Sequence, residues 1–469
     1  MEFWKLPHSG HAPAAIDARS GKQWSYGELR HDVARLVEGL PRLGRKSLGL
    51  LAAQNQYQSV VMYLAALNAG AALILLDAAL NPELRQSLIA AYQPDWIYAA
   101  DGAHAHGYRL SSCGIDELFE NERPEDISIH PELALLLATS GSTGSPKLVR
   151  LSLGNLAANA ASIAQYLQLT PDERAITSLP LSYSYGLSVI NSHLSAGACV
   201  VLTDDGVLQR GFWEAMDRHG CTSFAGVPYT YQMLLQTGLL KTKGGTLKTL
   251  TQAGGHLEER YVREMLALAL ARGWKFFVMY GQTEATARIS YVPFEQLGEK
   301  IGTVGVAIPE GVLTVDEGTE ELIYSGPNVM LGYAECLEDL AKGDELYGVL
   351  RTGDLARRDD DGYFYITGRL KRFLKMFGKR FNLDDMEKFV ARRCETSIAC
   401  FGRDDLLMAA VEGENHSEKT HTIICETFNL PRSVVKVVMV PKLPRTPNGK
   451  MDYKRLAEVS LKQVVGAND

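Results

Sequence analysis

A run of small, hydroxyl-bearing residues follows an apolar stretch within residues 135–150, "LLLATSGSTGSPKLVR". Backbone N–H groups in a glycine-rich turn can point at phosphate oxygens, and serine, threonine and lysine side chains add further donors. The segment therefore predicts a loop that binds a polyphosphate directly after a buried strand. Its candidate ligand residues are Ser140, Gly141, Ser142, Thr143, Gly144 and Lys147.

This loop differs from a Walker A loop, in which Gly-Lys-Ser/Thr opens a helix. Here Pro146 precedes Lys147, and Leu148 follows it. Taken alone, the segment is also compatible with a surface turn rich in small residues, so the later segments have to decide between the two interpretations.

Five later segments follow in a fixed order: "GGHL" at 254–257, "YGQTEAT" at 280–286, "LRTGDL" at 350–355, "GRLKRFLKMFGKRFNLDDME" at 368–387 and "PRTPNGKMD" at 444–452. Together with the hydroxyl-rich loop, they resemble the motifs of the adenylate-forming superfamily. That superfamily includes acyl-CoA synthetases, aryl-acid ligases, peptide-synthetase adenylation domains and luciferases. The resemblance runs nearly end to end, because "WSYGEL" and "LNAGAALILLD" near the start also fit the family pattern.

The resemblance implies a two-step activation of a carboxylic acid. In the first step the carboxylate attacks the α-phosphorus of ATP, pyrophosphate leaves, and an acyl-adenylate forms. In the second step the acyl group passes to a thiol. Two anions meet in the first step, so positive charge and preorganised donors should dominate catalysis. The implied cofactors are ATP and Mg²⁺.

For the phosphate end of ATP, the resemblance implies that Ser140, Thr143 and Lys147 hold the β- and γ-phosphates. Glu284 is the implied Mg²⁺ ligand, since a carboxylate oxygen suits a hard cation. Thr283 beside it is implied to contact the α-phosphate. Taken singly, Glu284 could instead cap the start of a helix.

For the nucleoside end, the resemblance implies that Asp354 accepts both ribose hydroxyls, as one carboxylate can. The other implied residues on this side are Gly254, Gly255 and His256 along one face of adenine, Tyr280 and Gly281 along the other, and Arg369 near the ribose and phosphates. The alternative for Asp354 is a turn-forming aspartate.

Lys450 is the implied catalytic lysine, which bridges the carboxylate and the α-phosphate as charge builds in the transition state. The alternative is one more solvated lysine, the commonest fate of this residue type. In the family, the small C-terminal domain turns about a hinge for the second step. The hinge position is usually Asp or Lys and is Arg372 here, a mild departure.

The substrate segment is "LPLSYSYGL" at 179–187. Many acyl- and aryl-activating relatives carry His at the position of Tyr183, and amino-acid-activating relatives carry Asp near Ser184. Without that carboxylate an α-ammonium would lack its partner, which is costly in a buried site. We therefore expect an aryl acid or a short to medium acyl acid, with Tyr183, Ser184 and Gly226 in the pocket. A stand-alone amino-acid-activating enzyme remains an alternative, as does a degenerate relative that binds nucleotide or acid without turnover.

The thiol acceptor is expected to be a separate molecule, either CoA or an acyl carrier protein, because the sequence shows no carrier domain. The short final module slightly favours the carrier protein. The basic segment "KRFLKMFGKR" at 371–380 could meet an acidic carrier or the phosphates of CoA, or could be a solvated face.

Composition narrows the class of protein. With 469 residues the chain is too long for one core, and its net charge of −7 argues against a nucleic-acid-binding protein, which needs a basic face. Seven scattered cysteines without CxxC spacing suggest neither disulfides nor zinc, as in a reducing cytoplasm. The start, "MEFWKLPHSG", does not resemble a secretory signal. We expect a cytoplasmic monomer or homodimer.

The elements that must position these residues follow from hydrophobic periodicity. Helical and strand-like segments alternate through most of the chain, which predicts an α/β fold with helix-covered parallel sheets. The apolar stretch from Val60 predicts a helix, a glycine stop and a buried strand in place of a membrane span, because Asn68 and Gly70 interrupt it. After about residue 300 short alternating strands predict a small β-rich subdomain. The predicted domains are a large adenylation domain over 1–370 and a small, mobile α+β C-terminal domain over 371–469.

Overall fold

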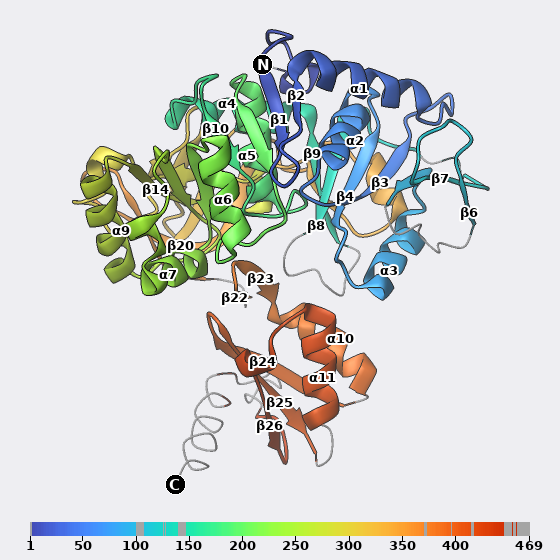
Figure 1. Ribbon diagram of the computed structural model, residues 1–469. Helices are drawn as coiled ribbons and strands as arrows, with labels where there is room; N and C mark the ends of the chain where they lie inside the picture. Colours follow the sequence, from blue (N-terminus) through green and yellow to red (C-terminus); the bar gives the residue numbers. More distant parts are fainter. Residues whose placement is uncertain are drawn as a thin grey trace. The chain divides into compact units, whose positions relative to one another are not determined.

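A computed structural model describes residues 2–99, 107–124, 126, 128–138, 147–369, 373–394, 396–413, 417–444, 453 and 456. These residues divide into two compact units, one before and one after position 370 (Figure 1). Each unit is described by itself below. The larger unit contains three sheets in its described part, and the smaller unit contains two.

The first sheet of the large unit has the strand order β19-β9-β8-β4-β3-β5-β7-β6. Strands β5, β3, β4 and β8 run parallel and are almost entirely buried, as expected for strands covered on both faces. The strands are β3 (Leu48–Ala53), β4 (Ala72–Asp77), β5 (Trp96–Tyr98), β6 (Tyr108–Leu110), β7 (Leu118–Asn121), β8 (Leu133–Ala138), β9 (Leu148–Ser152) and β19 (Gly332–Ala334).

Helices α1 (Tyr26–Gly39), α2 (Tyr57–Asn68) and α3 (Pro82–Tyr92) accompany this sheet. The apolar stretch from Val60 forms α2, then a turn at Gly70 with φ of 71°, then β4, which confirms the predicted helix, glycine stop and buried strand. Within the part of the chain that the structure describes, no helix is long and apolar enough to cross a membrane.

The second sheet has the order β16-β15-β14-β13-β12-β10-β11-β1-β2, and its strands from β14 to β1 run parallel. Helices α4 (Leu153–Tyr166), α5 (Ser184–Ser195), α6 (Arg210–His219), α7 (Pro228–Thr237), α8 (Leu239–Thr242) and α9 (Glu259–Arg272) belong to this half. The strands are β1 (Pro13–Asp17), β2 (Gln23–Ser25), β10 (Arg174–Ile176), β11 (Cys199–Leu202), β12 (Ser223–Gly226), β13 (Thr249–Gln252), β14 (Lys275–Tyr280), β15 (Ser290–Tyr291) and β16 (Val306–Ala307).

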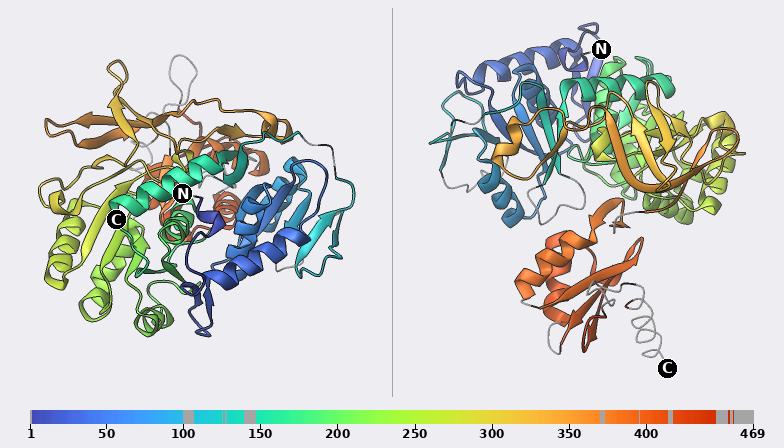
Figure 2. Two further views of the ribbon diagram at one scale, coloured as in Figure 1. Left: turned by 90° about the horizontal axis from the view of Figure 1, so that it is seen from above. Right: turned by 180° about the vertical axis from the view of Figure 1, so that it is seen from behind.

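Two helices join the sheets. Helix α4 packs on β8 and β9 of the first sheet, α5 packs on β10 and β11 of the second, and the two helices pack on each other (Figure 2). This layered arrangement of helices and parallel sheets confirms the predicted α/β class.

The β-rich subdomain is an antiparallel sheet of β17 (Val312–Val315), β18 (Glu321–Ser325), β20 (Val349–Arg358) and β21 (Phe364–Arg369). It lies in the sequence region where short alternating strands were expected. Short 3₁₀ helices lie at Phe3–Lys5, Thr283–Ala285, Phe294–Gln296, Leu337–Ala341 and Arg432–Val434.

The small unit begins with a hairpin of β22 (Phe373–Met376) and β23 (Lys379–Asn382). A second sheet contains β24 (Ile398–Arg403), β25 (Leu406–Glu412) and β26 (Val435–Val440), accompanied by α10 (Leu383–Cys394) and α11 (Ser417–Phe428). This α+β content matches the expectation. The last predicted helix, from residue 451, lies largely outside the described residues.

Candidate functional site

The candidate nucleotide site lies where three neighbouring parallel strands end. Strand β12 ends at Gly226, β13 is followed by Gly254 and Gly255, and β14 ends at Tyr280. The carboxyl ends of parallel strands share one edge of a sheet, and ligands bind in the crevice there. This topology brings together three predicted segments that are distant in the sequence.

A hydrogen-bond network connects the "YGQTEAT" segment to the β-rich subdomain. The Tyr280 hydroxyl donates to Asp354 Oδ2 over 2.6 Å, and Gln282 Nε2 donates to the same oxygen over 3.1 Å. Gln282 also donates to the Thr352 carbonyl at 2.9 Å. Asp354 is 2% exposed and stands opposite Arg369 in the β20–β21 register. Gln282 was not among the predicted site residues, although it lies inside the singled-out segment at 280–286.

Two glycines allow the chain to pass close to this network. A Cβ on Gly281 would lie 1.8 Å from the Ala287 carbonyl oxygen, so only glycine fits the close approach of the two backbones. Gly254 has φ of 81°, in the left-handed region that favours glycine.

Thr283 contacts the start of helix α5. Its hydroxyl lies 3.1 Å from the Ser184 hydroxyl, so a predicted catalytic residue and a predicted substrate residue meet. Tyr183, just before the helix, is half-buried, and burial raises the pKa of its phenol to about 12 despite the opposing effect of the Arg288 charge.

Tyr333 on β19 links two further candidates. Its hydroxyl donates to Glu284 Oε1 over 2.8 Å, and the Lys147 ammonium lies 3.8 Å from the centroid of its ring. Glu335 lies 3.5 Å from Lys147 Nζ. Tyr333 was not among the predicted site residues, because nothing in the surrounding sequence "LGYAEC" indicates that it lies beside residues 147 and 284.

Arg150 on β9 fixes the segment that carries Tyr333. Its fully buried side chain donates to the Tyr333 carbonyl at 3.1 Å and to the Gly343 carbonyl at 3.2 Å, and it pairs with Glu345. A buried guanidinium that bonds several carbonyls orders the backbone around it.

Several predicted site residues lie outside the described residues: Ser140, Gly141, Ser142, Thr143, Gly144, Arg372 and Lys450. The backbone of Arg369 is described as part of β21. His256 is exposed on the turn after β13. The roles of all these residues stay predictions.

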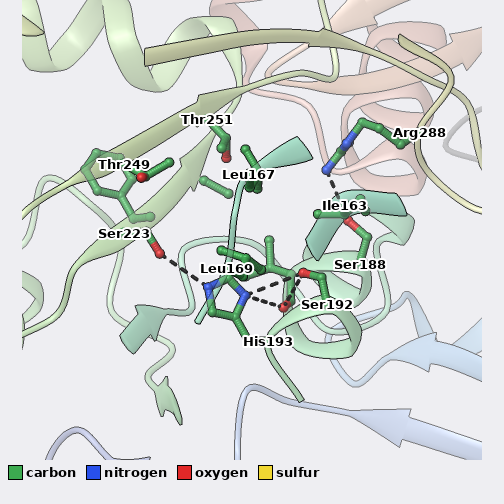
Figure 3. Close-up of a pocket in the computed structure, with 13 residues that line it drawn as sticks. Ile163, Leu167, Leu169, Ser188, Ser192, His193, Ser223, Thr249, Thr251 and Arg288 are labelled. Atoms are coloured by element: carbon green, nitrogen blue, oxygen red, sulfur yellow. Dashed lines mark hydrogen bonds between the residues drawn. The ribbon is translucent and has the colours of Figure 1, made fainter. Parts of the chain in front are cut away.

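A cavity lies between α4, α5, the strands β12 and β13, and the segment after Glu284 (Figure 3). Its polar lining includes Ser188, His193, Ser223, Thr251 and Arg288. The predicted pocket residues Ser184 and Gly226 belong to the same helix and strand as lining residues Ser188 and Ala225. Arg288 and His193 were not foreseen, although Arg288 stands four residues after Glu284.

The described residues contain no group of three or more His, Cys, Asp or Glu side chains able to hold a metal ion together. Any Mg²⁺ bound at Glu284 would take further ligands from water and phosphate, as Mg²⁺ commonly does.

The geometry agrees with the comparisons to known proteins. The model of the family described as AMP-binding enzyme matches residues 4–334. A feruloyl-CoA synthase from Amycolatopsis sp is 30% identical over 400 residues, which cover 78% of this chain and 78% of that protein. An L-proline–[L-prolyl-carrier protein] ligase from Pseudomonas fluorescens is 29% identical over 422 residues, 82% of this chain and 79% of that protein.

Among solved structures, the amide bond synthetase McbA from Marinactinospora thermotolerans superposes with a TM-score of 0.79 at 20% identity, covering 97% of this chain and 99% of that one. This likeness confirms the fold. With the match over most of its length and the motifs in family order, the chain belongs to the AMP-binding enzymes of the adenylate-forming superfamily.

Proposed function

We propose that this chain activates a carboxylic acid with ATP, releases pyrophosphate, and transfers the acyl group from the acyl-adenylate to a thiol. The observation that carries the proposal is the 2.6 Å hydrogen bond between Tyr280 and Asp354. It joins two motifs that lie 74 positions apart, at the strand-end edge where nucleotides bind in open α/β sheets.

In this proposal Asp354 binds the ribose hydroxyls, and Tyr280, Gly281 and the segment 254–256 enclose the adenine. Arg369 lies near the ribose and phosphates. Gln282 positions Asp354 by its hydrogen bond to Oδ2. A preorganised carboxylate binds without having to reorder when the nucleotide arrives, which favours affinity.

At the phosphate end, residues 140–144 and Lys147 hold the terminal phosphates, and Thr283 contacts the α-phosphate. Lys450 neutralises the charge that develops between the attacking carboxylate and the α-phosphate. Arg372 serves as the hinge between the two domains, 1–370 and 371–469.

Mg²⁺ fits Glu284, a hard carboxylate ligand whose Oε1 is oriented by the Tyr333 hydroxyl at 2.8 Å. When bound, Mg²⁺ supplies positive charge to the phosphate oxygens.

The acid is an aryl or short to medium acyl acid that enters beside Tyr183, Ser184 and Gly226. An α-amino acid is disfavoured, because Ser184 stands where amino-acid-activating relatives carry Asp, and the α-ammonium would lack that counter-charge. The acceptor is CoA, as the name of the feruloyl-CoA synthase states for that relative, or a separate carrier protein, as the name of the prolyl-carrier ligase states.

An ATP–pyrophosphate exchange assay over a panel of carboxylic acids tests the proposal. We expect acid-dependent exchange that falls at least a hundredfold in Lys450→Ala and in Glu284→Gln, since each loses charge stabilisation in the transition state. Exchange that persists unchanged in Lys450→Ala would contradict the assigned role. ATP binding without exchange for any acid would favour a nucleotide-binding protein without turnover.

A further inference from the structure

The cavity of Figure 3 contains a buried charge without an ionic partner in the described part of the chain. Arg288 is 2% exposed, and no described carboxylate lies within ion-pair distance of its guanidinium. Figure 3 shows its side chain directed toward Ser188 at the cavity wall. Removing a charge from water without a counter-charge is costly, which makes a buried guanidinium at a cavity wall a candidate for binding an anionic ligand.

The contacts that Arg288 makes are all with neutral groups. Its Nε donates to the Tyr166 hydroxyl at 3.3 Å, and Nη2 donates to the Ser188 hydroxyl at 3.1 Å. The guanidinium also lies 4.3 Å from the centroid of the Tyr185 ring. These groups orient the guanidinium and leave its charge uncompensated.

The opposite wall adds no charge. His193 Nδ1 donates to the Val189 carbonyl at 2.8 Å, and burial lowers the pKa of its ring, so the imidazole is neutral. A neutral imidazole with Nδ1 protonated has an unprotonated Nε2, which lies 3.5 Å from the Ser223 hydroxyl. The cavity therefore presents one cation, Arg288, among hydroxyls and a neutral ring.

The cavity lies one turn of α5 from Thr283, the residue proposed to contact the α-phosphate. Ser184 at the start of α5 contacts Thr283, and Ser188, four residues on, contacts Arg288. Four residues of α-helix span about 6 Å. An acid whose reacting carboxylate lies beside Thr283 and whose chain extends along α5 would bring its far end toward Arg288, where the cavity has a volume of about 20 Å³ and admits one small polar group.

We propose that the acid substrate is a short diacid, whose second anionic group, a carboxylate or sulfonate, pairs with the Arg288 guanidinium. This inference rests on the proposed function and adds the substrate class to it. The planar guanidinium can form two parallel hydrogen bonds to such a group, which gives directional selectivity as well as attraction.

The test compares matched acids in the exchange assay: succinate, glutarate and adipate against their monoamides, with 3-sulfopropionate as the sulfonate. We expect at least tenfold faster exchange with a diacid than with its monoamide. Arg288→Met should lose this preference. Arg263→Met is the matched control, because it removes the same charge from an exposed pair with Glu259 on α9.

Folding of the variant is checked by thermal unfolding. Tyr166 keeps its contact with Met279 Sδ at 3.0 Å, and Ser188 keeps its bond to the Tyr185 carbonyl at 2.7 Å, so no hydroxyl is stranded by the substitution. Removal of a buried, uncompensated charge is expected to leave the melting temperature unchanged or raised. A loss of diacid use in a variant that is equally stable supports a binding role over a structural one.

Two outcomes separate this inference from the proposed function. Exchange that is as fast with monoamides as with diacids, or a preference that survives in Arg288→Met, would overturn the diacid assignment and leave the ligase function intact. If no acid supports exchange, the melting temperature is measured with and without each diacid. A rise in melting temperature that Arg288→Met abolishes supports the anion site. The absence of such a rise overturns it.

Discussion

At the scale of single residues, the site depends on side chains that bond one another before any ligand binds. Asp354 and Glu284, the two carboxylates with proposed ligand roles, each accept a hydrogen bond from a tyrosine hydroxyl, Tyr280 and Tyr333 respectively. Such bonds fix the orientation of a carboxylate and reduce the entropy lost when it binds a ribose or a metal.

Tyr333→Phe isolates one of these bonds. The phenyl ring keeps the contact with the Lys147 ammonium, at 3.8 Å in the present chain, while the donor to Glu284 is lost. A hydrogen bond to a charged group contributes about 2 kcal/mol, so we expect a loss of roughly tenfold or more in ATP–pyrophosphate exchange. Half-maximal exchange should also require more Mg²⁺. Tyr333→Leu, which loses both contacts, should be worse; equal rates for wild type and Tyr333→Phe would contradict the coupling to Glu284.

His193 should contribute a pH-dependent part of the stability. Burial lowers the pKa of its ring from the ordinary value of 6.5, so the unfolded chain binds this proton at higher pH than the folded chain does. The stabilisation that comes from neutral His193 is complete above pH 6.5, the pKa of the unfolded chain's histidine. It is lost as the pH falls from there toward the lowered pKa of His193 in the folded chain.

In His193→Asn this titration is absent. We therefore expect the variant to lose less stability than wild type between about pH 7.5 and about pH 5.5, as measured by denaturant midpoints at the two pH values. The exposed His256→Asn serves as the control and should retain the wild-type difference. An unchanged difference in His193→Asn would rule out this contribution.

At the scale of elements, the site is assembled from strand ends and from one short edge strand. The strands β12, β13 and β14 bring together the segments proposed to bind the nucleotide, because they are parallel neighbours. Strand β19 is different, since it is antiparallel to β9 and carries Tyr333 into the site from a region more than 180 residues later in the sequence. The buried side chain of Arg150 donates to the Tyr333 carbonyl of this strand.

Arg150→Met should release this edge strand. The substitution removes the Arg150 bonds to the Tyr333 and Gly343 carbonyls and leaves Glu345 only its weaker pair with Lys342 at 4.0 Å, so we expect a loss of about 3 kcal/mol in the free energy of unfolding. The change is measured by denaturant unfolding. Arg210→Met removes an exposed pair with Glu214 and should change little. A melting curve of Arg150→Met that matches wild type would show that β19 is held without this residue.

At the scale of the whole molecule, the chain divides into two units whose described parts contain separate cores. The clusters around Leu73 and Phe276 belong to the large unit, and the cluster around Phe381 and Ile424 belongs to the small one. The proposed chemistry distributes its residues over both, since Asp354 and Glu284 belong to the first and Lys450 lies in the sequence of the second. Such a division suits a reaction of two steps, because a domain that moves as a unit can change which residues face the bound intermediate.

The sequence alone predicted the α/β class, the β-rich subdomain and the order of the motifs, because hydrophobic periodicity and turn residues are local properties of the chain. It also predicted that Tyr280, Thr283, Glu284 and Asp354 belong to one site, through resemblance. Only the tertiary structure identified Tyr333, Arg150 and the pair of Arg288 and His193. Their importance depends on contacts across long sequence separations and on burial, which removes water from around a charge, and neither property can be read from neighbouring residues in the sequence.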